Sequence, residues 1–71
     1  MKGYIVVEKI NDLVNLHYAV DFETANQYIK EMLPDINCSY YDEETGTAFG
    51  KNEFEQNWSV EVYNFEDIDI L

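Results

Sequence analysis

Residues 21–34 read DFETANQYIKEMLP, and this stretch decides the fold. Asp21 is a favourable N-cap, because its side-chain oxygen can accept a hydrogen bond from the first helical turn. Glu23 adds negative charge where the helix dipole favours it, and Pro34 cannot continue a helix. The pattern therefore predicts one helix over about 22–33. Its core-facing stripe consists of the apolar residues that recur at helical spacing, Phe22, Ala25, Tyr28, Ile29, Met32 and Leu33.

Two strands are predicted before the helix. Residues 3–10 are β-branched and aromatic and are apolar on both faces, which is typical of a central strand. A turn signal, Asn11-Asp12, follows them. Residues 14–20 then alternate with a period of two, which indicates a half-buried strand and completes a β-hairpin. One face of this second strand carries Val14, Leu16, Tyr18 and Val20.

Up to three strands are predicted after the helix. Residues 36–41 form a short strand, and the acidic residues 42–46 form a turn whose glycine can adopt a positive φ. Residues 47–49 are interpreted as the returning arm of a hairpin, and residues 50–52 as a loop. The last strand is predicted over 58–65. One of its faces carries Trp58, Val60 and Val62.

These elements predict an α+β fold and a single domain over residues 1–71. One helix packs on a small antiparallel sheet of three to five strands, in the order ββαβ(β)β. The expected core lies between the helix stripe and two strand faces, Val14/Leu16/Tyr18 and Trp58/Val60/Val62.

Cysteine usage and hydropathy predict a compartment. The only cysteine, Cys38, cannot form an internal disulfide, and a secreted domain of this size would normally need several. The N-terminal residues lack the apolar core of a signal peptide, and no apolar stretch reaches the roughly 18–20 residues of a membrane span. We expect a reducing cytoplasm, that of a host cell if a phage encodes the chain.

The sequence offers no recognisable catalytic or cofactor-binding machinery. His17 is the only histidine, and it lacks a sequence-local partner that would orient it for catalysis. One histidine and one cysteine fall short of the four ligands of a structural zinc site. The spacing of Asp42, Glu43 and Glu44 departs from that of a calcium loop. We therefore expect no enzyme, no metal and no cofactor.

The net charge is the most informative feature for function. The chain carries −11, contains no arginine, and has its charge unevenly distributed. Residues 1–41 hold six acidic and three basic residues, whereas residues 42–71 hold nine acidic residues and only Lys51. Such a surface repels both nucleic acid and anionic membrane, because binding to either requires clustered lysine and arginine.

The amount of charge suggests nucleic-acid mimicry. Duplex DNA carries one charge per about 1.7 Å, so eleven charges correspond to about 19 Å of duplex, against an expected width of roughly 28 Å for the folded chain. Glu53 and Glu55 are expected to form a row along one strand face. Aromatic residues interleaved with the acids suit a protein interface. The predicted protein-binding residues are Asp42, Glu43, Glu44, Glu53, Glu55, Glu61, Glu66, Asp67, Tyr40, Tyr41, Phe49, Phe54 and Tyr63.

In size, charge and composition the chain resembles small acidic anti-defence proteins of phages and mobile elements, of the anti-CRISPR or anti-restriction DNA-mimic type. The resemblance covers the whole chain but rests on no motif, so no family residue can be assigned. It implies an inhibitor that occupies the nucleic-acid-binding surface of a basic partner, such as a nuclease or a restriction or CRISPR effector.

Two other functions are weighed against mimicry. The first is a small regulatory or accessory module whose acidic face docks a basic partner without imitating nucleic acid. The second, more distant, is an enzyme. An exposed face with Tyr63 and Phe65, or an exposed C-terminal edge, would permit either a homodimer or a contact with another protein.

Overall fold

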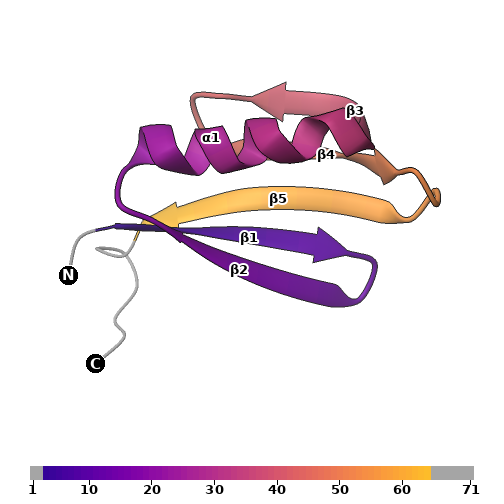
Figure 1. Ribbon diagram of the computed structural model, residues 1–71, viewed down its shortest axis with the longest axis horizontal. Helices are drawn as coiled ribbons and strands as arrows, with labels where there is room; N and C mark the ends of the chain where they lie inside the picture. The colour runs from indigo at the N-terminus through magenta and orange to yellow at the C-terminus, as the bar shows by residue number, and fades with distance from the viewer. Residues whose placement is uncertain (1–2, 65–71) are drawn as a thin grey trace.

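The computed structural model describes residues 3–64 and has the expected α+β fold, with one α-helix packed on a five-stranded antiparallel sheet. The strands lie in the order β2-β1-β5-β4-β3, and α1 runs roughly parallel to them (Figure 1). The elements are β1 (Tyr4–Ile10), β2 (Leu13–Ala19), α1 (Phe22–Met32), the short 3-10 helix η1 (Leu33–Asp35), β3 (Ile36–Asp42), β4 (Thr47–Asn52) and β5 (Asn57–Asn64).

The ends of α1 agree with the sequence signals to within one residue. Asp21 is the N-cap, and its Oδ1 accepts a hydrogen bond from the Thr24 amide at 2.7 Å. A hydrogen bond with the Thr24 side chain, and with a smaller effect the bond from the Thr24 amide, hold the pKa of the Asp21 carboxyl below its usual value. At the other end the α-helix stops at Met32, and Pro34 lies in the first turn of η1. An N–H group at that position would have no acceptor within the helix, so proline costs no hydrogen bond there.

The core lies between α1 and one face of the sheet. Trp58 and Val60 on β5 are buried there, as the sequence predicts, and Val62 packs against them. The buried Trp58 indole N–H donates a hydrogen bond to Glu8 Oε2 at 2.7 Å, which satisfies the one polar group of that side chain. The buried apolar residues are Val6, Ala19, Ala25, Ile29, Ala48, Trp58 and Val60.

The predicted core face of β2 is wrong. Leu16 is 65% exposed and Val14 is 53% exposed, because both lie on the side of the sheet opposite α1. The register explains this placement: the core residue Val6 pairs with His17, so His17 and not Leu16 shares the helix-facing side. Val20, predicted on the same face, lies beyond the end of β2 and is also exposed.

The chain after β3 is more regular than the sequence indicates. Residues 50–52, expected in a loop, belong to β4, and the turn begins at Glu53. Asn52 holds this turn, because its Oδ1 accepts hydrogen bonds from the amides of Phe54 and Gln56, each at 2.9 Å. Such side-chain capping of a turn is a common role of asparagine.

Candidate functional site

No helix or strand within residues 3–64 covers the face of the sheet opposite α1. We call this surface the open face. Strand register places its side chains in rows across the sheet, such as Leu16 beside Val7 and Val7 beside Glu61. The open face consists of Ile5, Val7, Lys9, Val14, Leu16, Tyr18, Tyr40, Phe49, Lys51, Ser59, Glu61 and Tyr63.

One half of the open face is aliphatic. On β2, Val14 and Leu16 lie two residues apart and are both more than half exposed. On β1, Val7 is the direct partner of Leu16, and Ile5 is the partner of Tyr18. Single exposed apolar residues are common on protein surfaces, but a contiguous group marks an interaction surface. These residues are missing from the predicted site, because the sequence pattern assigns Val14 and Leu16 to the core.

The β3–β4 side of the open face is aromatic, and two of the predicted site residues, Tyr40 and Phe49, meet there. The rings of Tyr40 and Phe49 are stacked, with their centroids 5.1 Å apart. Tyr63 donates a hydrogen bond to the Glu61 carboxylate, and this contact raises the pKa of the Tyr63 hydroxyl. The structure therefore brings Tyr40, Phe49, Tyr63 and Glu61 onto one surface.

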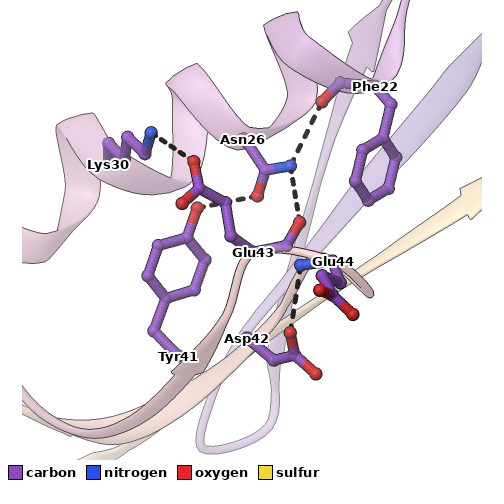
Figure 2. Close-up of polar contacts among 7 residues, drawn as sticks. All are labelled: Phe22, Asn26, Lys30, Tyr41, Asp42, Glu43 and Glu44. Atoms are coloured by element: carbon purple, nitrogen blue, oxygen red, sulfur yellow. Dashed lines mark hydrogen bonds and ion pairs between the residues drawn. The ribbon is translucent and has the colours of Figure 1, made fainter.

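The acidic turn between β3 and β4 is tied to the helix (Figure 2). Lys30 on α1 donates to the Glu43 carboxylate at 2.6 Å, and the same contact raises the pKa of Lys30. Asp42 Oδ1 accepts a hydrogen bond from the Glu44 amide at 3.0 Å, and its Oδ2 accepts one from the Tyr40 hydroxyl at 3.3 Å. Two of the three carboxylates in this turn thus have internal partners.

The buried side chain of Asn26 on α1 also holds the same turn. Asn26 on α1 donates through Nδ2 to the backbone carbonyl of Glu43 at 3.0 Å, and its Oδ1 accepts from the Tyr41 hydroxyl at 2.7 Å (Figure 2). Burial raises the pKa of Tyr41, with a smaller contribution from the Glu43 charge. Tyr41 therefore points towards α1 and away from Tyr40 and the open face.

Replacement of Asn26 by alanine is expected to lower the free energy of unfolding by about 1–3 kcal/mol, because the Tyr41 hydroxyl and the Glu43 carbonyl lose their buried partner. Gln27 is exposed on the same helix, and Gln27→Ala is the matched control with an expected change within about 0.5 kcal/mol. Urea denaturation of both variants measures the difference. Equal effects would contradict a structural role for the Asn26 contacts.

The acidic residues predicted for the site do not form one surface. Glu53, Phe54 and Glu55 lie in or next to the β4–β5 turn, and Glu55 has a φ of +60°, so the expected row along a strand is not formed. This turn and the Asp42–Glu44 turn lie at opposite ends of the six-residue β4, about 20 Å apart at the usual rise per residue. Glu66 and Asp67 lie outside the described residues.

A shallow cavity of about 310 Å³ lies between the end of α1 and the β4–β5 turn. It includes Glu8, an acid that the sequence analysis did not single out. The Glu8 side chain is only 14% exposed and accepts hydrogen bonds from Trp58 and Asn15, which gives it a structural role. The cavity is lined by Glu8, Ile10, Met32, Asp35, Ile36, Asn52, Glu53, Phe54 and Trp58.

The lone histidine and cysteine both lie on the helix-facing side of the sheet. His17 is next to Tyr28, and its buried Nε2 lies 3.9 Å from Glu8 Oε1 with no hydrogen bond to the described residues. Cys38 is half-buried and donates through Sγ to the Tyr40 carbonyl at 3.1 Å. Over residues 3–64, no three side chains of the metal-ligating types come together as a site.

Within the described part of the chain, α1 is far too short and polar to cross a membrane, and no other helix could do so. No protein-family model, curated protein or solved structure matches this chain. The open face is an apolar surface that α1 does not cover, and it is the basis of the function proposed below.

Proposed function

We propose that this protein is a protein-binding module that docks through its open face onto a partner with an apolar, basic-rimmed surface. One observation carries the proposal: Val14, Leu16 and their neighbours on β1 form an aliphatic patch on the side of the sheet that α1 does not cover. Full burial of one such side chain is favourable by about 1.5–3 kcal/mol, so a partner that covers several of them gains substantial affinity.

Charge selects the kind of partner. The open face carries Lys9 and Lys51 against Glu61, and Asp42 lies at its edge, so this surface is nearly neutral although the chain as a whole carries −11. The acidic turns lie at the two ends of the sheet and flank this neutral surface. An apolar partner surface with lysine and arginine around it complements this pattern, and the attraction should weaken with salt.

A second copy of the chain is a poorer partner for the open face. Pairing two open faces would place the acidic turns of both copies around one interface, and each copy carries a net charge of −11. Like charges brought together in this way oppose association. The open face therefore suits a basic protein better than a homodimer.

Site-specific photocrosslinking tests the proposal. Leu16 on the open face and Gln27 on the exposed side of α1 are each replaced by p-benzoylphenylalanine, and crosslinked proteins are identified by mass spectrometry. We expect the Leu16 position to capture a basic protein that the Gln27 position does not capture. Capture from Gln27 alone would overturn the proposal.

Affinity measurements with the captured partner make the test quantitative. Leu16→Ser is expected to raise the Kd at least about tenfold, because about 1.4 kcal/mol of lost burial corresponds to that factor. Phe54→Ser is the matched control, since Phe54 is 75% exposed on the β4–β5 turn and away from the open face. Equal losses in both variants would contradict docking through the open face.

Inhibition by nucleic-acid mimicry is the second candidate, favoured by the concentration of acidic residues after residue 41. If it is correct, duplex DNA displaces the protein from its partner. Conversion of the turn acids to their amides abolishes binding, whereas Leu16→Ser has little effect. A captured partner that duplex DNA never displaces would exclude mimicry. The turn acids to convert are Asp42, Glu43, Glu44, Glu53 and Glu55.

A further inference from the structure

β2 is an edge strand without the usual protection against pairing. Its seven residues pair with β1 in one continuous register, and no strand of residues 3–64 lies on its outer side. It contains no proline, no lysine and no carboxylate. Natural edge strands are usually protected by charges, proline, bulges or short length, because an exposed edge can pair with another strand.

The opposite edge of the same sheet is protected. In β3 the register shifts between Cys38 and Tyr40, which is a bulge or similar irregularity. Pro34 lies just before this strand, and Asp42 ends it. The two edges differ in this respect, so the lack of protection at β2 is a local property of that strand.

We propose that an extended segment of the partner pairs with β2 as a sixth strand of the sheet. This inference rests on the proposed function and specifies how the partner binds. Backbone hydrogen bonds along the edge would supply affinity, and alternate side chains would supply specificity. Apolar side chains of the added strand would lie beside Val14 and Leu16 and would extend the aliphatic half of the open face.

Charge at the ends of β2 defines the segment further. Asp12 precedes the strand and Asp21 follows it, and both are exposed. Lysine or arginine at the ends of the added strand would complement them. A second copy paired antiparallel about Leu16 would instead bring Asp12 of one copy near Asp21 of the other. The occupant that fits is therefore a short extended segment, alternately apolar, with basic ends.

A synthetic probe tests strand addition directly. The probe is the capped peptide Ac-Lys-Val-Thr-Val-Thr-Val-Lys-NH2, titrated into the full-length ¹⁵N-labelled protein at low salt. We expect amide hydrogen exchange within residues 13–19 to slow at least about tenfold for the amides that point away from β1. Amides of β3, on the other edge, should keep their exchange rates.

Two control peptides separate strand addition from simpler contacts. The same sequence with N-methylated valines lacks the main-chain donors on one edge, and its affinity should fall at least about tenfold. The same sequence with glutamate in place of both lysines should also bind at least about tenfold more weakly, because the ends of β2 are acidic.

Each outcome decides the inference. Binding of the N-methylated peptide with equal affinity, with shifts spread over β1 and β2, would overturn strand addition and leave docking through the open face intact. A different outcome is slow amide exchange at β2 without peptide, with protection that increases with protein concentration. That result would show that a second copy of the chain pairs with β2, and it would contradict the proposal of a different protein as partner. No change at β2 with millimolar peptide would overturn the inference, whereas the photocrosslinking at Leu16 tests the proposed function separately.

Discussion

Replacement of Ile29 by alanine is expected to lower the free energy of unfolding by about 2–5 kcal/mol. Ile29 is completely buried between α1 and the sheet, so the change removes apolar contacts and leaves a cavity. A domain of this size is only marginally stable. The conservative Ile29→Val, with an expected loss of about 0.5–1.5 kcal/mol, therefore keeps the measurement within range.

Leu16→Ala is the matched control for the core variants. Leu16 is an aliphatic residue of similar size, but it lies on the open face, so its truncation should change the free energy of unfolding by no more than about 0.5 kcal/mol. Urea denaturation followed by Trp58 fluorescence and circular dichroism gives both values. If Leu16→Ala proved as destabilising as Ile29→Ala, the assignment of Leu16 to an uncovered surface would be wrong.

Replacement of Gly50 by alanine is expected to lower the free energy of unfolding substantially, second only to Ile29→Ala among the changes proposed. A Cβ atom at Gly50 would lie 2.3 Å from the Asn37 carbonyl oxygen and 2.8 Å from the Cys38 Cα, both in the backbone of β3. Backbone atoms cannot move aside as a side chain can, so β3 must separate from β4 at the position where its register already shifts. We expect a loss of about 1–3 kcal/mol or more.

Gly3→Ala is the control for the Gly50 variant. Its Cβ would meet the ring of Tyr18 at 2.7 Å, but the contact involves the far end of a side chain, which can rotate. Urea denaturation should show a clearly smaller loss, and hydrogen exchange should accelerate in β3 only for Gly50→Ala. A Gly3→Ala variant that is as unstable as Gly50→Ala would contradict this account.

The helix is predictable from the sequence because its signals are local. Asp21 can cap only the residues that follow it, and Pro34 acts only on its neighbours, so no knowledge of the rest of the fold is needed. The alternation in β2 is equally local and correctly predicts a strand. Which of its two faces is buried depends on the register with β1, and that register is a property of the whole sheet.

The sequence nevertheless contained a signal for the open face. The strand over residues 3–10 is apolar on both sides, but the chain has one predicted helix, and one helix can cover only one face of a sheet. Apolar residues on the second face of that strand, Ile5 and Val7, therefore imply an apolar surface without a cover. The sequence predicts one helix but two apolar sheet faces. Comparison of these two numbers predicts that Val14 and Leu16 lie beside Ile5 and Val7 on the face that the helix does not cover.

The division of the acidic site follows from the connectivity of antiparallel strands. Consecutive hairpin turns lie at opposite ends of a sheet, so the turns before and after β4 cannot adjoin. Topology alone therefore separates Asp42–Glu44 from Glu53 and Glu55. Tyr40 and Phe49 do meet, because neighbouring strands place them opposite each other on the same face, whereas Tyr63 lies on that face beside Ile5.

The position of β5 in the sheet has a consequence for folding. β1 and β2 form one hairpin and β3 and β4 form another, and β5 joins them because it lies between β1 and β4. Its contacts with β1 are distant in sequence, as between Trp58 and Glu8, which are 50 positions apart. Such non-local pairing slows folding. During synthesis the two hairpins remain separate until β5 leaves the ribosome. Until then the edge of β1 that later pairs with β5 has no strand beside it, and unpaired strand edges favour aggregation.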